Sequence, residues 1–154
     1  MIAVTLFFSA AALIVYLLFG YPLLVALLAR VRPRPVRSAF QQISISIIVA
    51  VHNGAPWIRQ KLESLLAVDY PGTLLEMIVV CDGCTDETEN IVREFADRNI
   101  RLVSVPRCGK CAAVNAGMEV AGGEILVFTD VRQRIAPDAL QRLVNCFADP
   151  SVGV

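Results

Sequence analysis

The chain has 154 residues, 56% of them hydrophobic, and its 14 basic side chains balance 14 acidic ones. This apolar content excludes a disordered chain and exceeds that of an ordinary soluble domain. Residues 38–154 hold ten bases and all 14 acids, a net charge of −4. Such a charge excludes the basic surface that nucleic-acid binding requires, so no nucleic-acid partner is expected. A chain of this length has room for one soluble domain.

Residues 1–29 account for most of the apolar excess, because they contain no charged side chain. This run exceeds the roughly 20 residues that a membrane-spanning helix needs, and it lacks the basic start of a cleavable signal peptide. We therefore predict a retained transmembrane anchor. The residues that follow without an acid among them are Arg30, Arg32, Arg34 and Arg37. Their charge predicts a basic, proline-rich linker over residues 30–42 on the cytoplasmic side of the membrane, with the soluble part in the cytoplasm.

From residue 43 onward, short apolar runs alternate with helical patterns, which is typical of successive βα units. Strands are predicted over residues 45–51, 77–81, 102–105 and 125–129, with residues 152–154 beginning another. Helices are predicted from about 56 to 68, from a cap at Thr85 or Asp86, from 110 to about 120, and from 137 to about 148. The β-branched strands predict an α/β fold, a parallel sheet with helices on both faces.

Polar residues follow each predicted strand directly. They are His52 and Asn53, Asp82, the segment 107–110, and Asp130. Because parallel strands end at one edge of the sheet, where α/β proteins bind ligands, we expect these residues to converge on one site. Gly109-Lys110 does not match a phosphate loop, since Ser104 and Cys111 occupy positions that the motif gives to other residues. A lysine at a helix N-terminus remains, which suits a phosphate or is simply a solvated side chain.

Two carboxylates suggest separate roles. Asp82 lies just before Gly83, where its oxygens suit hydrogen bonds from a nucleobase or a ribose, or a turn. Asp130 ends an apolar strand, where it suits Mg²⁺ or Mn²⁺ bridging a diphosphate, or a purely structural position. A single carboxylate binds such an ion weakly, so the oxygens of the substrate would complete its coordination.

Two cysteine pairs offer another interpretation, a zinc-stabilised module. The pairs are Cys81 with Cys84 and Cys108 with Cys111. Their spacing resembles a four-cysteine zinc ribbon, although the gap between the pairs exceeds the usual one. Against zinc, Cys81 ends a core strand, and cysteine is a small residue that is readily buried.

Four segments in series, ISIIVAVHN (45–53), VVCDGCTD (79–86), GKCAAVNAG (109–117) and VFTD (127–130), resemble the family 2 glycosyltransferases across residues 43–154. The anchor, the arginine-rich linker and Asp69-Tyr70-Pro71 are similar to bacterial membrane-bound members that build polysaccharides. The resemblance implies the Rossmann-like, donor-binding half of a GT-A fold. It also implies inverting transfer of a sugar from a nucleotide-diphosphate sugar, with a UDP-sugar favoured, to a glycan or lipid-linked acceptor.

The resemblance also assigns site residues by position. Those expected to contact the nucleoside are Ala50, Val51, His52, Asn53 and Asp82. Lys110 is expected near the base or the diphosphate, and Asp130 is the first acid of the DxD motif that binds Mg²⁺ or Mn²⁺. Arg132 stands where the second acid is expected, so metal dependence stays open and Arg132 is expected to bind the diphosphate directly.

The family's catalytic base belongs to the acceptor-binding half, so we expect it beyond Val154. The 154 residues are then expected to be the donor half of a longer enzyme, with negligible transfer activity alone. A catalytically inactive, membrane-tethered module that binds nucleotide sugars or a partner is the alternative.

Overall fold

The computed structural model of the protein describes residues 1–33 and 35–153. The chain divides into two units, Met1–Val36 and Arg37–Val154. Two predicted positions lie outside the described residues: Arg34 in the basic linker, and Val154 at the end of the last predicted strand.

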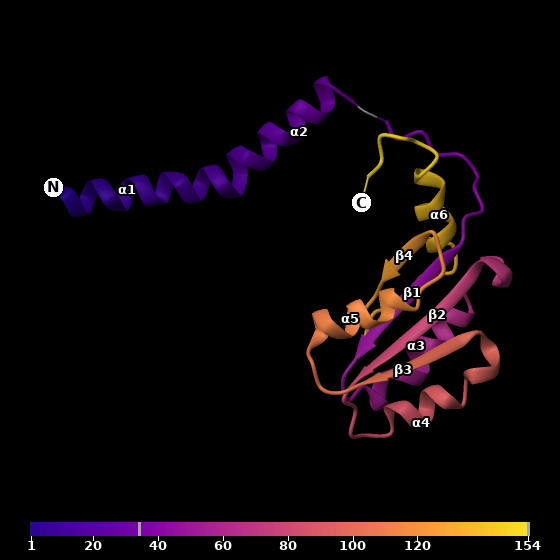
Figure 1. Ribbon diagram of the computed structural model, residues 1–154. Helices are drawn as coiled ribbons and strands as arrows, with labels where there is room; N and C mark the ends of the chain where they lie inside the picture. Colours follow the sequence, from indigo (N-terminus) through magenta and orange to yellow (C-terminus); the bar gives the residue numbers. More distant parts are fainter. Residues whose placement is uncertain (34, 154) are drawn as a thin grey trace. The chain divides into compact units, whose positions relative to one another are not determined.

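The first unit contains one apolar helix over Ile2–Val31, with a mean hydropathy of 2.5 and no buried part. It consists of α1 (Ile2–Val15), a π-helical turn (Tyr16–Gly20) and α2 (Tyr21–Val31), as Figure 1 shows. In the π turn, the N–H of Tyr21 donates to the carbonyl of Tyr16. A widened turn accommodates Pro22, whose ring crowds the preceding turn of a regular helix. By length and composition the helix is able to cross a membrane.

This helix runs two residues further than the predicted anchor. Arg30 and Val31 are helical, so the linker does not begin at residue 30. Arginine favours helix, whereas the residue before a proline disfavours it. The helix therefore ends at Val31, and Arg32, which precedes Pro33, leaves the helical conformation.

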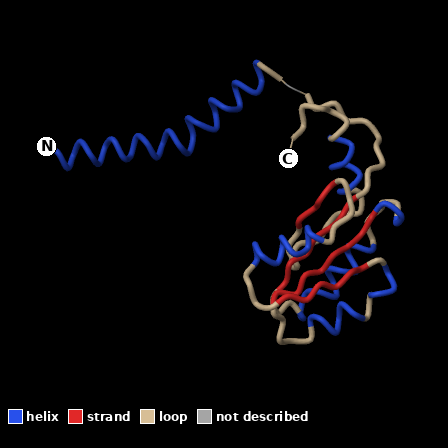
Figure 2. Tube along the Cα trace, viewed as in Figure 1, coloured by secondary structure: helices blue, strands red, loops and turns tan. Residues whose placement is uncertain are grey.

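The second unit contains a four-stranded parallel sheet (Figures 1 and 2), as predicted. Its strands are β1 (Ile45–Val51), β2 (Leu75–Asp82), β3 (Ile100–Val105) and β4 (Ile125–Phe128), in the order β3-β2-β1-β4. β1 and β2 are central and almost completely buried, which explains their continuous apolar sequences. Strands β2 and β3 begin two residues before their predicted starts.

Helices cover both faces of the sheet, as predicted. On one face, side chains of α3 (Ala55–Leu66), α4 (Thr88–Arg93) and α6 (Ala139–Cys146) form one core cluster with alternate strand residues, such as Ile47 and Val49 of β1 and Val79 of β2. On the other face, α5 (Lys110–Glu119) packs through Ala113 on Ile48 and Val80. Short 3₁₀ helices over Gly72–Leu74 and Ala96–Arg98 precede β2 and β3.

The structure differs from two predictions about the ends of elements. Helix α4 begins at Thr88 with Glu87 as its N-cap residue, although the carboxylate of Asp86, one residue earlier, accepts a hydrogen bond from the N–H of Thr88 at 3.1 Å. Val152 and Gly153 form no strand. The N–H of Val152 instead donates to the carbonyl of Asp149, and the Asp149 carboxylate accepts hydrogen bonds from Ser151, which closes a turn.

Candidate functional site

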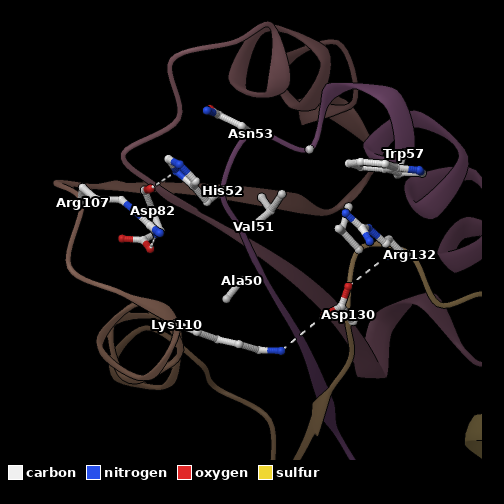
Figure 3. A pocket seen from close by; sticks show the side chains of 12 residues that line it. Ala50, Val51, His52, Asn53, Trp57, Asp82, Arg107, Lys110, Asp130 and Arg132 are labelled. Atoms are coloured by element: carbon white, nitrogen blue, oxygen red, sulfur yellow. Dashed lines mark hydrogen bonds and ion pairs between the residues drawn. The ribbon is translucent and has the colours of Figure 1, made fainter.

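A cavity of about 440 Å³ opens at the carboxyl ends of the strands (Figure 3). All eight residues predicted for the site line it: Ala50, Val51, His52, Asn53, Asp82, Lys110, Asp130 and Arg132. Gly54, Trp57, Arg107 and Val131 complete its wall. The structure thus brings together residues from four loops that are distant in sequence, as the parallel topology predicts, while the role of each residue remains a prediction.

Asp82 holds the loop that leads into α5. Its side chain is buried, and it accepts hydrogen bonds from the N–H groups of Cys108 (2.7 Å) and Gly109 (3.1 Å to each oxygen). Its second oxygen also pairs with the guanidinium of Arg107. The Cys108 hydrogen bond and, less strongly, the charge of Arg107 hold the pKa of Asp82 below its usual range. A carboxylate offers about four acceptor positions, so this loop occupies them all.

The end of β1 is tied to the same region. The ring atom Nδ1 of His52 lies 2.7 Å from the carbonyl oxygen of Asp82. Because a carbonyl only accepts, Nδ1 carries a proton there, and Nε2 of a neutral ring remains an acceptor. Asn53 adopts a left-handed conformation with φ of 50°, and its amide oxygen accepts a hydrogen bond from the N–H of Thr85 at 2.9 Å. Asn53 therefore shapes the wall of the cavity.

The N-terminus of α3 is already bound to an anionic side chain. Asp86 accepts hydrogen bonds from the N–H groups of Ala55 (3.0 Å) and Thr88 (3.1 Å), and the Thr88 hydroxyl oxygen accepts from the N–H of Gly54 (2.8 Å). Free N–H groups at a helix start attract phosphate. Since the N–H groups of Gly54 and Ala55 at the start of α3 are used, the cationic residues on the other side of the cavity are the groups that suit a phosphate.

Lys110, Asp130 and Arg132 form that cationic side. Nζ of Lys110 lies 3.3 Å from one oxygen of Asp130, and the backbone N–H of Arg132 donates to the other at 3.2 Å. The Arg132 hydrogen bond and, less strongly, Lys110 keep the pKa of Asp130 below its usual range, so Asp130 is ionised at neutral pH. The Lys110 side chain is 70% exposed, so this ion pair is weak and readily exchanged for a ligand.

Trp57 has a role that its sequence position did not reveal. The sequence suggests simple packing for this residue at the start of an amphipathic helix. In the structure, its ring stacks against the guanidinium of Arg132, with 4.2 Å between the ring centroid and the guanidinium carbon (Figure 3). A cation above an indole face is held electrostatically, which orients Arg132 at the edge of the cavity.

Lys61 is a further residue that sequence reasoning missed. Its side chain is 1% exposed, and Nζ donates to the Thr129 hydroxyl (2.7 Å) and to the backbone carbonyl of Gln133 (2.6 Å). Burial lowers the pKa of Lys61 to about 8, against the opposing effect of the Asp130 charge. The sequence did contain a sign of this role, because the charged Lys61 shares the buried side of α3 with the apolar residues Ile58 and Leu62.

The donor set in the cavity fits a divalent cation that shares its coordination with phosphate. Asp82 is fully engaged, which leaves the half-exposed Asp130 as the carboxylate for the ion. Mg²⁺ typically binds proteins through one or two carboxylates and takes its other ligands from phosphates and water. Asp130 would therefore hold the ion together with a bound diphosphate.

The zinc interpretation of the cysteines is wrong. Within residues 1–33 and 35–153, no group of three or more histidine, cysteine or acidic side chains is placed to hold a metal. Cys81 is buried in β2, whereas Cys108 and Cys111 are exposed at the start of α5. Burial, and then the neighbouring Cys84, raises the pKa of the Cys81 thiol, so it remains protonated as a core residue.

Comparisons with known proteins show which family the chain is similar to. The family model of glycosyl transferase family 2 matches residues 46–154. The chain is 32% identical over 108 residues to the putative glycosyltransferase EpsH of Bacillus subtilis, with 69% of this chain and 31% of EpsH covered. It is 29% identical over 112 residues to the uncharacterized glycosyltransferase YibD of Escherichia coli, with 71% of this chain and 32% of YibD covered. The chain thus spans about a third of the length of these curated relatives.

Solved structures are similar as well. The mannosyltransferase PcManGT of Pyrobaculum calidifontis, in complex with GDP-Man and Mn²⁺, is 35% identical with a TM-score of 0.80, covering 94% of this chain and 45% of PcManGT. Residues 1–349 of TarS of S. aureus, in complex with UDP-GlcNAc, are 28% identical with a TM-score of 0.63, covering 66% of this chain and 30% of that TarS chain.

Proposed function

Because the chain belongs to glycosyl transferase family 2, we propose that its cavity binds the nucleoside diphosphate of a sugar donor. One observation carries the proposal: Lys110, Asp130 and Arg132 meet at one side of a cavity whose other side is formed by Asp82 and His52. A volume of about 440 Å³ lies within the range of small-molecule sites. Inverting transfer of the sugar to a glycan or lipid-linked acceptor is the proposed activity of the whole enzyme.

We assign the diphosphate to the cationic side of the cavity. Lys110 contributes a mobile positive charge, and Arg132 contributes a guanidinium that suits two phosphate oxygens at once. Both groups stabilise the negative charge that develops on the departing diphosphate. Mg²⁺ or Mn²⁺ at Asp130, when bound, would add further positive charge there, a proposal supported by the Mn²⁺ in the PcManGT complex.

The nucleoside is proposed to lie toward His52 and Asp82. Nε2 of His52 offers an acceptor there, and Arg107, paired with Asp82, offers donors. The similar structures contain GDP-Man in one case and UDP-GlcNAc in another, so both bases require testing, with a UDP-sugar as the first candidate.

Binding measured by calorimetry on the full chain tests this proposal. We expect UDP or GDP to bind, and Arg132→Ala and Lys110→Ala each to weaken binding about tenfold. Arg142→Ala is the matched control, because Arg142 is an exposed arginine on α6, paired with Asp138 and outside the cavity. If neither nucleotide binds, or if the control weakens binding equally, the donor site is not where we place it.

We further propose that the helix Ile2–Val31 anchors the protein in the bacterial inner membrane, with the cavity in the cytoplasm. Its apolar length and the arginines after it support this orientation. The relative ExoO of Rhizobium meliloti, 33% identical over 102 residues, is a succinoglycan biosynthesis protein, which favours a polysaccharide product. The full chain should remain in membranes after alkaline extraction, whereas residues 37–154 should be released; release of both would contradict the anchor.

A further inference from the structure

We propose that Lys61 is a positioning residue that fixes the turn carrying Asp130 and Arg132, and so determines where the cavity holds a diphosphate. This inference rests on the proposed function. The turn follows β4 and is closed by a hydrogen bond from the N–H of Gln133 to the carbonyl of Asp130 at 3.1 Å. The ammonium group of Lys61 reaches it from α3.

The Lys61 ammonium spans the turn from end to end. It donates to the hydroxyl of Thr129, just before Asp130, and to the carbonyl of Gln133, just after Arg132. Both ends of the five-residue segment 129–133 are thereby held by one side chain. Displacement of either end would stretch a hydrogen bond to a charged group, which is costlier to lose than a neutral one.

A second contact from the same helix supports this function. Trp57 precedes Lys61 by four residues, so the two side chains lie on the same side of α3. The Trp57 ring stacks against the guanidinium of Arg132, while Lys61 binds the side-chain hydroxyl of Thr129 before it and the main-chain carbonyl of Gln133 after it. Helix α3 therefore attaches to both the side chain and the main chain of the turn.

Stability alone does not explain a lysine at this position. Its neighbours Ile58, Leu62 and Leu65 are completely buried apolar residues, and Lys61 is 1% exposed. Desolvation of a buried charge is expensive, and an apolar residue of similar size is often equally or more stabilising. Burial lowers the pKa of Lys61 to about 8, so the group remains mostly charged at neutral pH. What a charged group adds is directional contact with the turn.

Two variants that remove the contact from opposite sides test the inference. Lys61→Met removes the donor, and Thr129→Val removes one acceptor at nearly constant volume. Each should weaken binding of UDP or GDP about tenfold and leave binding of the nucleoside alone unchanged. Thr129→Ser, which keeps the hydroxyl, should bind like the wild type. Leu62→Ala, on the same helix, should lower the stability of the protein. It should not change the ratio between the affinity for UDP or GDP and the affinity for the nucleoside.

The dynamics of the turn give a readout that needs no ligand. In Lys61→Met and Thr129→Val, backbone order parameters of residues 130–133 should fall from the rigid value of about 0.85 toward about 0.6, while Leu62→Ala leaves them unchanged. Absence of nucleotide binding by the wild type would reject the proposed function alone. Unchanged order parameters, or wild-type binding by both variants, would overturn the role of Lys61.

Discussion

The guanidinium of Arg132 lies over the indole ring of Trp57, 4.2 Å from its centroid. This contact holds a positive charge at the position where the family pattern places the second acid of its metal motif. The cavity wall consequently contains three cationic residues, Arg107, Lys110 and Arg132, against the two carboxylates Asp82 and Asp130. An anionic ligand is favoured there, and we propose that Arg132 supplies part of the positive charge that a metal ion would contribute.

Removal of the Trp57 ring should release Arg132. We expect Trp57→Leu to weaken UDP or GDP binding about two- to fivefold, since an exposed cation–π contact contributes about 0.5–1 kcal/mol. Trp57→Phe keeps an aromatic face and should retain most of the affinity. Calorimetry on both variants measures the difference. Equal affinities for the two would show that the ring does not hold Arg132.

Arg132→Asp would restore the acidic pair of the motif. A second carboxylate near Asp130 strengthens a site for Mg²⁺ or Mn²⁺, because such ions bind through oxygen ligands. We expect the variant to bind nucleoside diphosphate only when the metal is present, while the wild type retains measurable binding in a chelator. Titrations with Mn²⁺ and with EDTA separate the two cases. Chelator-resistant binding by the variant would contradict the exchange of roles between ion and guanidinium.

The buried carboxylate of Asp82 should make the fold sensitive to acid. Its pKa is lowered in the folded chain, mainly by the Cys108 hydrogen bond, relative to about 3.9 when unfolded. The ionised Asp82 carboxylate therefore stabilises the fold fully when the pH is above its pKa in the unfolded chain. This stabilisation is lost as the pH falls through the lower pKa of the folded chain. Asp82→Asn should have a lower Tm than the wild type at pH 7, and the difference should shrink below about pH 4.

Thermal unfolding between pH 3 and pH 7 measures this effect. The exposed Asp97→Asn serves as the control, because Asp97 lies on the surface between α4 and β3. The Tm difference between Asp82→Asn and the wild type could instead be the same at pH 3 and at pH 7. That result would show that the hydrogen-bonded carboxylate does not contribute in the way proposed.

Gly117 allows α5 to approach the sheet closely. A Cβ atom added there would lie 2.7 Å from Cγ2 of Ile48 and 3.0 Å from Cγ2 of Val80. Gly117→Ala should destabilise the protein by about 1–3 kcal/mol, because this overpacking outweighs the better helix propensity of alanine. Gly72→Ala, with no atom within 4 Å of the added Cβ, should cause no loss. Denaturant unfolding compares the two; a stabilised Gly117→Ala would show that α5 shifts freely.

Much of the fold was readable from local patterns. The apolar run of residues 1–29, the β-branched runs and the polar residues after them indicated the long apolar helix, the parallel sheet and the edge at which the cavity lies. These features are local because hydrophobic periodicity reports which side of an element is buried. Four motifs in series also indicated the family, which the match over residues 46–154 confirmed.

Only the tertiary structure decided which polar groups touch. Asp82 reaches the loop 107–109 across more than 20 residues of sequence, and Lys61 reaches Thr129 across 68. Such contacts depend on strand order and on how closely each helix packs, and neither follows from periodicity. Asp86 bonds to the start of α3, although the sequence suggested only a local cap for α4. Long-range hydrogen bonds are selected by the packed geometry, so only the folded chain assigned these side chains their partners.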